Sequence, residues 1–131
     1  MNLFTPKGFL QVGGVVLVLV GVLGMAGVIG PTPAKSMFGA MWWFDTPENV
    51  AHLTLGVVGL LASFTLNTQM QKMLVMLLGV VGVLVGLYNL TSMGLLGANL
   101  EVPTDMVLHL VVGTWALYAS LMGAKSPAKT A

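Results

Sequence analysis

The sequence predicts an all-α membrane protein with four transmembrane helices, built as a tandem repeat of two helical hairpins. Three observations support this prediction: the composition, four long apolar stretches, and a repeated histidine motif. Of the 131 residues, 56% are hydrophobic and only 7% are charged, whereas a soluble domain carries roughly 25% charged residues. So few charges are unable to cover a water-facing surface, and the lipid bilayer is therefore the expected solvent and first partner of the chain.

The composition also argues against several classes of function. The net charge of +1 does not favour a nucleic-acid partner, because affinity for phosphate backbones comes from many lysines and arginines. The chain contains no cysteine, so thiol catalysis, disulfide exchange and thiolate metal sites are excluded. The same absence excludes small four-helix enzymes that pass electrons from thiols to quinones.

Four stretches are long enough to cross the hydrocarbon core, which takes about 20 residues of helix. They run over about 8–30, 47–66, 73–93 and 104–123. Pro47 and Pro103 stand at the start of the second and fourth stretches, where a first helical turn accepts or follows proline. The first stretch is longer than the apolar part of a signal peptide, so we expect it to be kept. The prediction is one domain over 1–131, with 124–131 as a cytoplasmic tail.

The lysines predict the orientation. Four of the five fall on one side of the predicted bundle, together with both termini: Lys7, Lys72, Lys125 and Lys129. Lys35 and all four acids fall on the other side. Because lysine-rich short loops stay in the cytoplasm, we expect both termini to be cytoplasmic, in the inner membrane. An aromatic belt is expected at the outer interface, just before the second span, from Trp42, Trp43 and Phe44.

The second and fourth spans align without gaps, and the first and third spans align over a run of Gly, Val and Leu. The matched pairs of the even spans are Glu48 with Asp105, His52 with His109, Gly56 with Gly113 and Ser63 with Ser120. The repeats then cover about 8–66 and 73–123. Since each unit has two spans, both units enter the membrane from the same side, as parallel repeats about an axis normal to the bilayer. The two histidines are therefore expected at one depth.

The two histidine motifs also suggest a family. They read N-x-x-H-x-x-x-G from Asn49 through His52 to Gly56, and D-x-x-L-H-x-x-x-G from Asp105 through His109 to Gly113. In these motifs, and over most of its length, the chain resembles the uncharacterised bacterial four-helix integral membrane proteins that are grouped as a domain of unknown function. The resemblance implies the four-helix fold and implies no activity.

Small residues share a helix face with the histidines. Acid, His and Gly recur at four-residue spacing in both even spans, so they line one face of each helix. Small residues let helices approach closely in lipid. We therefore expect Gly56 and Gly113 to pack against other helices, together with Gly82 and Gly86, which form a G-x-x-x-G motif in the third span.

The histidines permit three interpretations, because each lies roughly 6–8 Å inside its helix and is a candidate functional group at that depth. In the first, each ring forms a hydrogen bond with the carboxylate one turn earlier, or with a partner helix, and fixes helix docking. In the second, His52 and His109 bind haem, a chlorin or a divalent metal ion, and Glu48 and Asp105 orient the rings or bind the ion. In the third, the acid and histidine pairs form an outer-face proton or ion site, which Tyr88 and Asn89 are expected to adjoin.

The function expected from these observations is that of a small structural or accessory membrane protein rather than an enzyme. Its partners would be a larger protein assembly or further copies of itself. The cofactor binder and the outer-face proton or ion site are the alternatives. No acid or base lies near the centre of the membrane, where transporters place the groups that couple to ions, and this argues against a small exporter.

Overall fold

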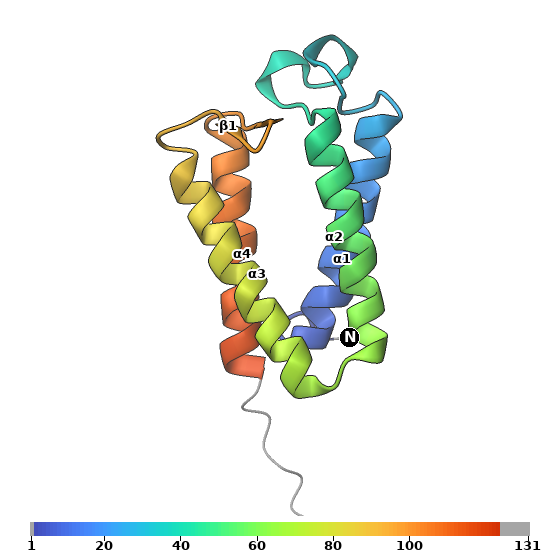
Figure 1. Ribbon diagram of the computed structural model, residues 1–131, viewed down its shortest axis with the longest axis vertical. Coiled ribbons are helices and arrows are strands. Elements are labelled where there is room, and N and C mark those ends of the chain that lie inside the picture. Colours follow the sequence, from blue (N-terminus) through green and yellow to red (C-terminus); the bar gives the residue numbers. More distant parts are fainter. Residues whose placement is uncertain (1, 124–131) are drawn as a thin grey trace, which may run out of the picture.

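The computed structural model describes residues 2–123 and contains two antiparallel helical hairpins (Figure 1). The first hairpin pairs α1 with α2, and the second pairs α3 with α4. The helices are α1 (Pro6–Met25), α2 (Thr46–Thr65), α3 (Thr68–Tyr88) and α4 (Thr104–Met122). The predicted all-helical class is confirmed for the described residues. The predicted tail, 124–131, lies outside them.

Short elements fill the two long loops. The loop between α1 and α2 holds the 3₁₀ turns η1 (Pro33–Lys35) and η2 (Gly39–Met41). The loop between α3 and α4 holds a two-residue antiparallel pairing of β1 (Gly94–Leu95) with β2 (Ala98–Asn99). Both loops lie at the same end of the bundle, at the top of Figure 1.

Three helices in the described part are long and apolar enough to cross a membrane, namely α1, α3 and α4. This is the fold of an integral membrane protein, as length and composition indicate. α2 has the same length, 20 residues, but is not among the three. Its beginning carries Glu48, Asn49 and His52, and these polar residues lower its hydropathy.

Three helix boundaries differ by about five residues from the predicted ones, and one of them is the end of α3, at Tyr88 rather than near residue 93. α1 ends at Met25 rather than near residue 30, because a turn with Gly27 in the left-handed region (φ 81°) follows it. α3 begins at Thr68 rather than at 73, where Asn67 caps the helix by accepting a hydrogen bond from the N–H of Met70 at 3.0 Å. The connection between the hairpins is therefore very short.

The early start of α3 has a physical reason in Gln71. Polar residues before 73 suggested a loop, but the Gln71 side chain is buried and donates hydrogen bonds to the carbonyl oxygens of Ser63 at 3.0 Å and Leu66 at 2.9 Å. These carbonyl groups belong to the end of α2, which has no further helical partners for them. Gln71 thus ties the second hairpin to the first.

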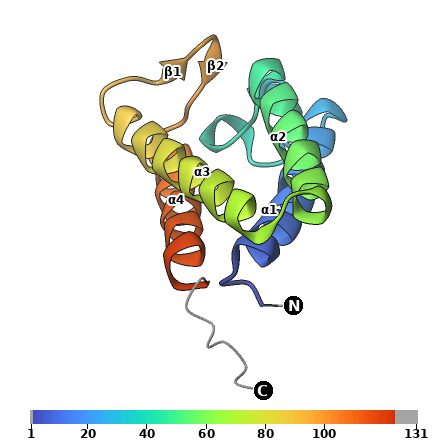
Figure 2. The same cartoon turned by 60° about the horizontal axis from the view of Figure 1, so that its bottom comes forward.

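The hairpins pack on each other at one end, which we name the lysine end because Lys7 and Lys72 begin α1 and α3 there. The two views agree that the ribbons converge at this end, which Figure 2 turns forward. A single apolar cluster forms the contact, from Phe9, Leu10, Ala62, Val75, Ala116 and Ala119. Trp115 packs edge-on against Phe9 with ring centroids 4.6 Å apart. The core of the protein therefore lies off-centre, at the lysine end.

Glycines set the separation of the two helices within each hairpin. A Cβ atom at Gly56 would lie 2.7 Å from the backbone nitrogen of Val18. A Cβ atom at Gly113 would lie 2.6 Å from the backbone nitrogen of Val83. Both distances are shorter than a carbon atom tolerates, so the helices approach with backbone against backbone.

The third-span glycines face the same interface from the other side. A Cβ atom at Gly82 would lie 3.0 Å from the Cα of Gly113, and one at Gly86 would lie 2.8 Å from the Cγ of Leu110. α3 and α4 are therefore in contact along most of their length. The helix pairs reach up to the opposite end of the bundle, where the candidate site lies.

Candidate functional site at the acidic end

The end opposite to the lysine end carries all four acids of the chain, Asp45, Glu48, Glu101 and Asp105, and we name it the acidic end. Asp45 caps α2, since its side chain accepts a hydrogen bond from the N–H of Glu48 at 2.9 Å. In return Glu48 Oε2 accepts from the N–H of Asp45 at 3.0 Å. This capping box satisfies two N–H groups at the start of the helix. It also holds Glu48 in a buried position.

Asp105, at the beginning of α4, joins the two hairpins. It is buried, and its Oδ2 accepts a hydrogen bond from the backbone N–H of Glu101 at 2.7 Å. Its Oδ1 accepts from the indole N–H of Trp42 at 3.1 Å. Trp42 belongs to the loop of the first hairpin, so this bond crosses between the hairpins at a point far from the apolar core.

Two further hydrogen bonds cross between the hairpins at the same end. The backbone N–H of Asn99 donates to Asp45 Oδ2 at 2.7 Å, and the hydroxyl of Thr104 donates to the carbonyl oxygen of Met41 at 3.1 Å. The loops therefore form a polar joint, which we define by Trp42, Asp45, Asn99, Glu101 and Asp105.

Glu101, in the loop between α3 and α4, is a carboxyl group with a raised pKa. It is buried, and its Oε1 accepts a hydrogen bond from the Asn99 side chain. Burial, reinforced by the hydrogen bond and charge of Asp105, raises the pKa of Glu101 from 4.5 to about 7. Glu48 lies within range of three charges, those of Asp105, Asp45 and Glu101, and all three are negative. Glu101 therefore holds its proton to a higher pH than an ordinary carboxyl group does.

The two histidines lie one turn inside the acids. The His109 Nδ1 is 2.7 Å from the carbonyl oxygen of Asp105, which requires the proton on Nδ1 and leaves Nε2 as an acceptor. His52 packs edge-on against Phe44 with centroids 5.3 Å apart. The two histidines are close enough for the charge of one to act on the other.

The predicted hydrogen bond from each histidine to the carboxylate one turn earlier is not formed. The carboxylates of Glu48 and Asp105 instead turn toward backbone N–H groups and the Trp42 indole. His109 uses the Asp105 carbonyl group, and His52 Nδ1 is buried without a hydrogen-bond partner among the described residues. N–H groups at a helix start attract carboxylates more directly than a ring one turn deeper does.

Unsatisfied acceptors gather at this end. Within residues 2–123, five buried side-chain atoms have no hydrogen-bond partner: Glu48 Oε1, Asn49 Oδ1, His52 Nδ1, Asn89 Oδ1 and Glu101 Oε2. A buried polar atom without a partner costs about 1–3 kcal/mol. A proton on a carboxyl group converts one acceptor into a donor and so reduces this cost.

The described residues do not assemble the predicted metal ligands around one point. Among residues 2–123, no group of three or more His, Asp or Glu side chains is arranged to hold a metal ion. The carboxylates of Glu48 and Asp105 accept hydrogen bonds from N–H groups instead. Binding of haem, a chlorin or a divalent metal ion by the two histidines stays a prediction.

Sequence reasoning missed several members of the polar joint. Trp42 was assigned to an interfacial belt, but its indole N–H points inward to Asp105, and Phe44 is buried rather than facing lipid. Asn89 adjoins the joint as expected, since its amide donates to the carbonyl oxygen of Leu100 at 3.2 Å, whereas Tyr88 is exposed. The one local signal was the D-x-x-E spacing of the capping box, which is readable in the sequence.

Comparison of the chain with protein-family models, with curated proteins and with solved structures finds no match. The family resemblance drawn from the histidine motifs therefore stays a prediction. What the site does has to be inferred from its geometry.

Proposed function

We propose that this chain is a small accessory protein of the cytoplasmic membrane, and that its acidic end is a proton-binding joint between its two hairpins. One observation carries the proposal: buried carboxyl groups from both hairpins meet at one end, with acceptor oxygens left unpartnered among the described residues. This deepens the interpretation of an outer-face proton site, with the carboxyl groups rather than the histidines as the principal proton holders.

The joint responds to protons through the charges that meet there. With a proton on Glu101, its carboxyl group can donate a hydrogen bond to Asp105 and the pair carries a single negative charge. Loss of that proton places two negative charges side by side in the second hairpin, next to Asp45 of the first hairpin, whose Oδ2 accepts a hydrogen bond from the N–H of Asn99. Of the described residues, the one lysine at this end, Lys35, lies in η1 on the loop of the first hairpin. Deprotonation therefore pushes the loops of the two hairpins apart.

Exposed apolar side chains on the same loops support the accessory role. The loops that form the joint carry large apolar residues on their surface, namely Met37, Met41, Met93, Leu96 and Val102. Exposed apolar groups gathered on one part of a protein are typical of contact surfaces. A joint that loosens with pH would change the shape of this surface and so its affinity for a larger assembly or a second copy.

We also infer that α2 is the fourth transmembrane span. α1 and α3 both begin at the lysine end and run to the acidic end, so the chain has to return between them (Figure 1). α2 makes this return alongside α1 over its whole length. Its ionisable residues, Glu48 and His52, lie within its first two turns, at the interface, where an ionisable side chain costs less than at the bilayer centre.

Equivalent contacts support the proposed tandem repeat. A Cβ atom at Gly14 would lie 2.8 Å from the Cγ of Leu60, and one at Gly79 would lie 2.8 Å from the Cγ of Leu117. Gly14 aligns with Gly79, and Leu60 aligns with Leu117, when the first hairpin is laid on the second. The two contacts are therefore equivalent. The hydroxyl groups of the matched serines also donate to matched carbonyl oxygens, Ser63 to Leu60 and Ser120 to Leu117.

The orientation proposed is that both termini are cytoplasmic and the acidic end faces outward. Lys7 and Lys72 at the lysine end support it, while Lys125 and Lys129 lie outside the described residues. Cysteines introduced at Ser36 and Gln69, in this cysteine-free chain, should react with an impermeant reagent from opposite sides of the membrane. Reaction of the cysteine at position 69 from outside would reverse the orientation.

An infrared pH titration of the purified protein in lipid tests the proton-binding joint. The absorption of protonated carboxyl groups should persist well above pH 5 and should fall in a step with a midpoint near 7, where Glu101 loses its proton. Glu101→Gln should remove that step, and Asp105→Asn should leave it in place with a lower midpoint, because the neighbouring negative charge that raises the pKa of Glu101 is lost. If every carboxyl group of the wild type titrates below pH 5, no proton is held in the joint and the proposal fails.

A further inference from the structure

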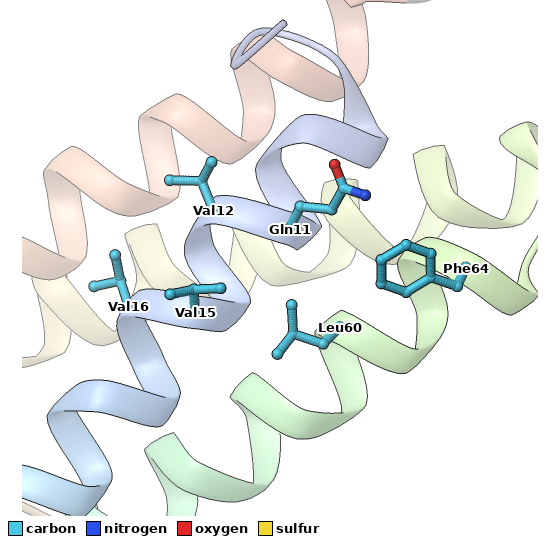
Figure 3. Close-up of a pocket in the computed structure, with 6 residues that line it drawn as sticks. All are labelled: Gln11, Val12, Val15, Val16, Leu60 and Phe64. Atoms are coloured by element: carbon cyan, nitrogen blue, oxygen red, sulfur yellow. The ribbon is translucent and has the colours of Figure 1, made fainter. Parts of the chain in front are cut away.

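A shallow apolar groove runs along the first hairpin between α1 and α2, and neither of the proposed roles uses it (Figure 3). Its volume is about 460 Å³. The lining residues come from both helices: Gln11, Val12, Val15, Val16, Leu60 and Phe64. Gln11 and Phe64 lie together at one end of the groove in Figure 3. Gln11 is the one polar residue among those that line it. The remainder is lined by aliphatic groups.

The depth of the groove follows from its position along α1. At 1.5 Å per residue, residues 11–16 lie roughly 7–15 Å from the start of the helix at Pro6. A hydrocarbon core is about 30 Å thick, so the groove falls within the leaflet at the lysine end. The molecules that meet a helix surface at this depth are the acyl chains of that leaflet.

A lysine stands at the entrance of the groove. The Lys7 ammonium is 6.0 Å from the centroid of the Phe64 ring, and Phe64 forms the end of the groove nearest to the lysine end. Lys7, Gln11 and Val15 follow one another at four-residue spacing, so they lie along one ridge of α1. From the interface inward, the ridge therefore presents first the positive charge of Lys7, then the amide of Gln11 and then the aliphatic side chain of Val15.

The charge at this end favours one class of lipid. All four acids of the chain lie at the acidic end, whereas Lys7 and Lys72 lie at the lysine end. A lysine near the surface attracts anionic headgroups. The groups of a phospholipid follow the same order as the ridge, since the phosphate precedes the ester carbonyl groups, which precede the acyl chains.

We infer that the groove binds one acyl chain of an anionic phospholipid, with Lys7 at its phosphate group and Gln11 at an ester carbonyl oxygen. The ammonium of Lys7 donates hydrogen bonds to the phosphate, and the Gln11 amide donates to the ester oxygen one turn deeper. This inference does not depend on the proton-binding joint, which lies at the other end of the bundle.

Native mass spectrometry of the full chain, released from detergent with phosphatidylglycerol or phosphatidylcholine, tests the charge requirement. The wild type should retain one phosphatidylglycerol more strongly than phosphatidylcholine. Lys7→Gln should weaken retention of phosphatidylglycerol about fivefold, the change expected for one lysine at a membrane surface. Lys72→Gln, at the same end but on α3, is the matched control and should retain it. Equal retention of the two lipids by the wild type would overturn the inference.

Filling the groove tests its shape. Val15 lines the groove, and Val22 lies two turns further along nearly the same face of α1; both are 48% exposed. Val15→Trp should abolish retention of the lipid, while Val22→Trp should leave it unchanged. Equal retention by the two variants would contradict the inference. Loss of a dimer rather than of a lipid in Val15→Trp would also contradict it, and would assign the groove to a second copy of the chain.

Discussion

At the lysine end the hairpins are joined by packed apolar side chains, whereas at the acidic end they are joined by hydrogen bonds to buried carboxyl groups. Leu10, Val75 and Ala119 are almost completely buried at the first end. At the second, the Trp42 indole and the Asn99 backbone donate to carboxylates of the opposite hairpin. The apolar cluster and the polar joint therefore hold the same two hairpins together by different forces.

The difference teaches how a small membrane bundle can combine a permanent contact with a conditional one. Lipid tails are as apolar as leucine, so apolar contact between helices depends on close packing rather than on exclusion of water. Such packing does not change with pH. We propose that the polar joint, which depends on the charge of its carboxyl groups, strengthens or weakens with proton binding.

The largest expected effect is on the acidic end and depends on pH. The pKa of Glu101 is raised from 4.5 to about 7 on folding, so the folded protein binds this proton more tightly than the unfolded chain does. The contribution of Glu101 to stability is therefore full below pH 4.5 and is lost as the pH rises to 7. The loss is at most roughly 3 kcal/mol.

Unfolding of the protein in detergent, followed at pH 5 and pH 8, measures this contribution. The wild type should be less stable at pH 8, and Glu101→Gln, which stays neutral, should lose most of that difference. A variant that keeps the full pH dependence would show that another group is responsible.

At the lysine end, Leu10→Ala should destabilise the protein by about 2 kcal/mol at both pH values. This is the low end of the range for buried leucine in soluble proteins, because transfer of leucine from lipid to the protein interior gains little. Leu19→Ala, on the same helix but exposed, should change stability by less than about 0.5 kcal/mol. A pH-dependent effect of Leu10→Ala would break the distinction between the two ends.

The glycine contacts lie between the two ends of the bundle. Their contribution to stability should depend neither on the pH nor on the packing of the apolar cluster. Gly56→Ala should cost about 1.5 kcal/mol by overpacking, since its Cβ would meet the backbone of Val18 at 2.7 Å. Gly59→Ala is the matched control, because the nearest atom to its Cβ is 3.7 Å away. The aligned position in α4 is already an alanine, Ala116. Equal thermal stability of the two variants would show that α1 and α2 do not approach as closely as described.

The smallest expected effect concerns a single bond of the polar joint. Trp42→Phe keeps the aromatic ring and removes the N–H that donates to Asp105. The expected loss is about 1 kcal/mol, the order of one hydrogen bond. Trp43→Phe, also half-buried, is the control. Chemical unfolding of both variants at pH 5, where the joint is protonated, measures the difference, and equal stability would remove Trp42 from the joint.

Local sequence patterns were sufficient for the helices but not for the joint. Apolar length located four helices, because a helix satisfies its own backbone hydrogen bonds in lipid. The glycine spacing pointed to the close faces of Gly56 and Gly113, since residues four apart share a face. The start of α3 was missed because Gln71 resembles a loop residue, whereas it is buried by its bonds to the end of α2.

The polar joint depends on contacts between distant loops. Trp42 and Asp105 are 63 residues apart, and neither loop has a periodic pattern from which the other could be located. The histidine motifs correctly indicated the acidic end as the location of the polar residues. The carboxyl groups of Asp45 and Glu101 were not recognised as part of a site, because their burial results from the way in which the two loops meet.

The most direct test of the two-joint account is a pair of distances measured between spin labels at the two ends. Cysteines are absent from the chain, so label pairs can be introduced at the exposed positions Ala40 and Leu96 of the acidic end and Thr65 and Leu121 of the lysine end. Raising the pH from 5 to 8 should lengthen and broaden the Ala40–Leu96 distance and leave the Thr65–Leu121 distance unchanged. Glu101→Gln should hold the acidic-end distance short at both pH values. An Ala40–Leu96 distance that stays the same from pH 5 to pH 8 in the wild type, or a lysine-end distance that changes as much, would contradict the account.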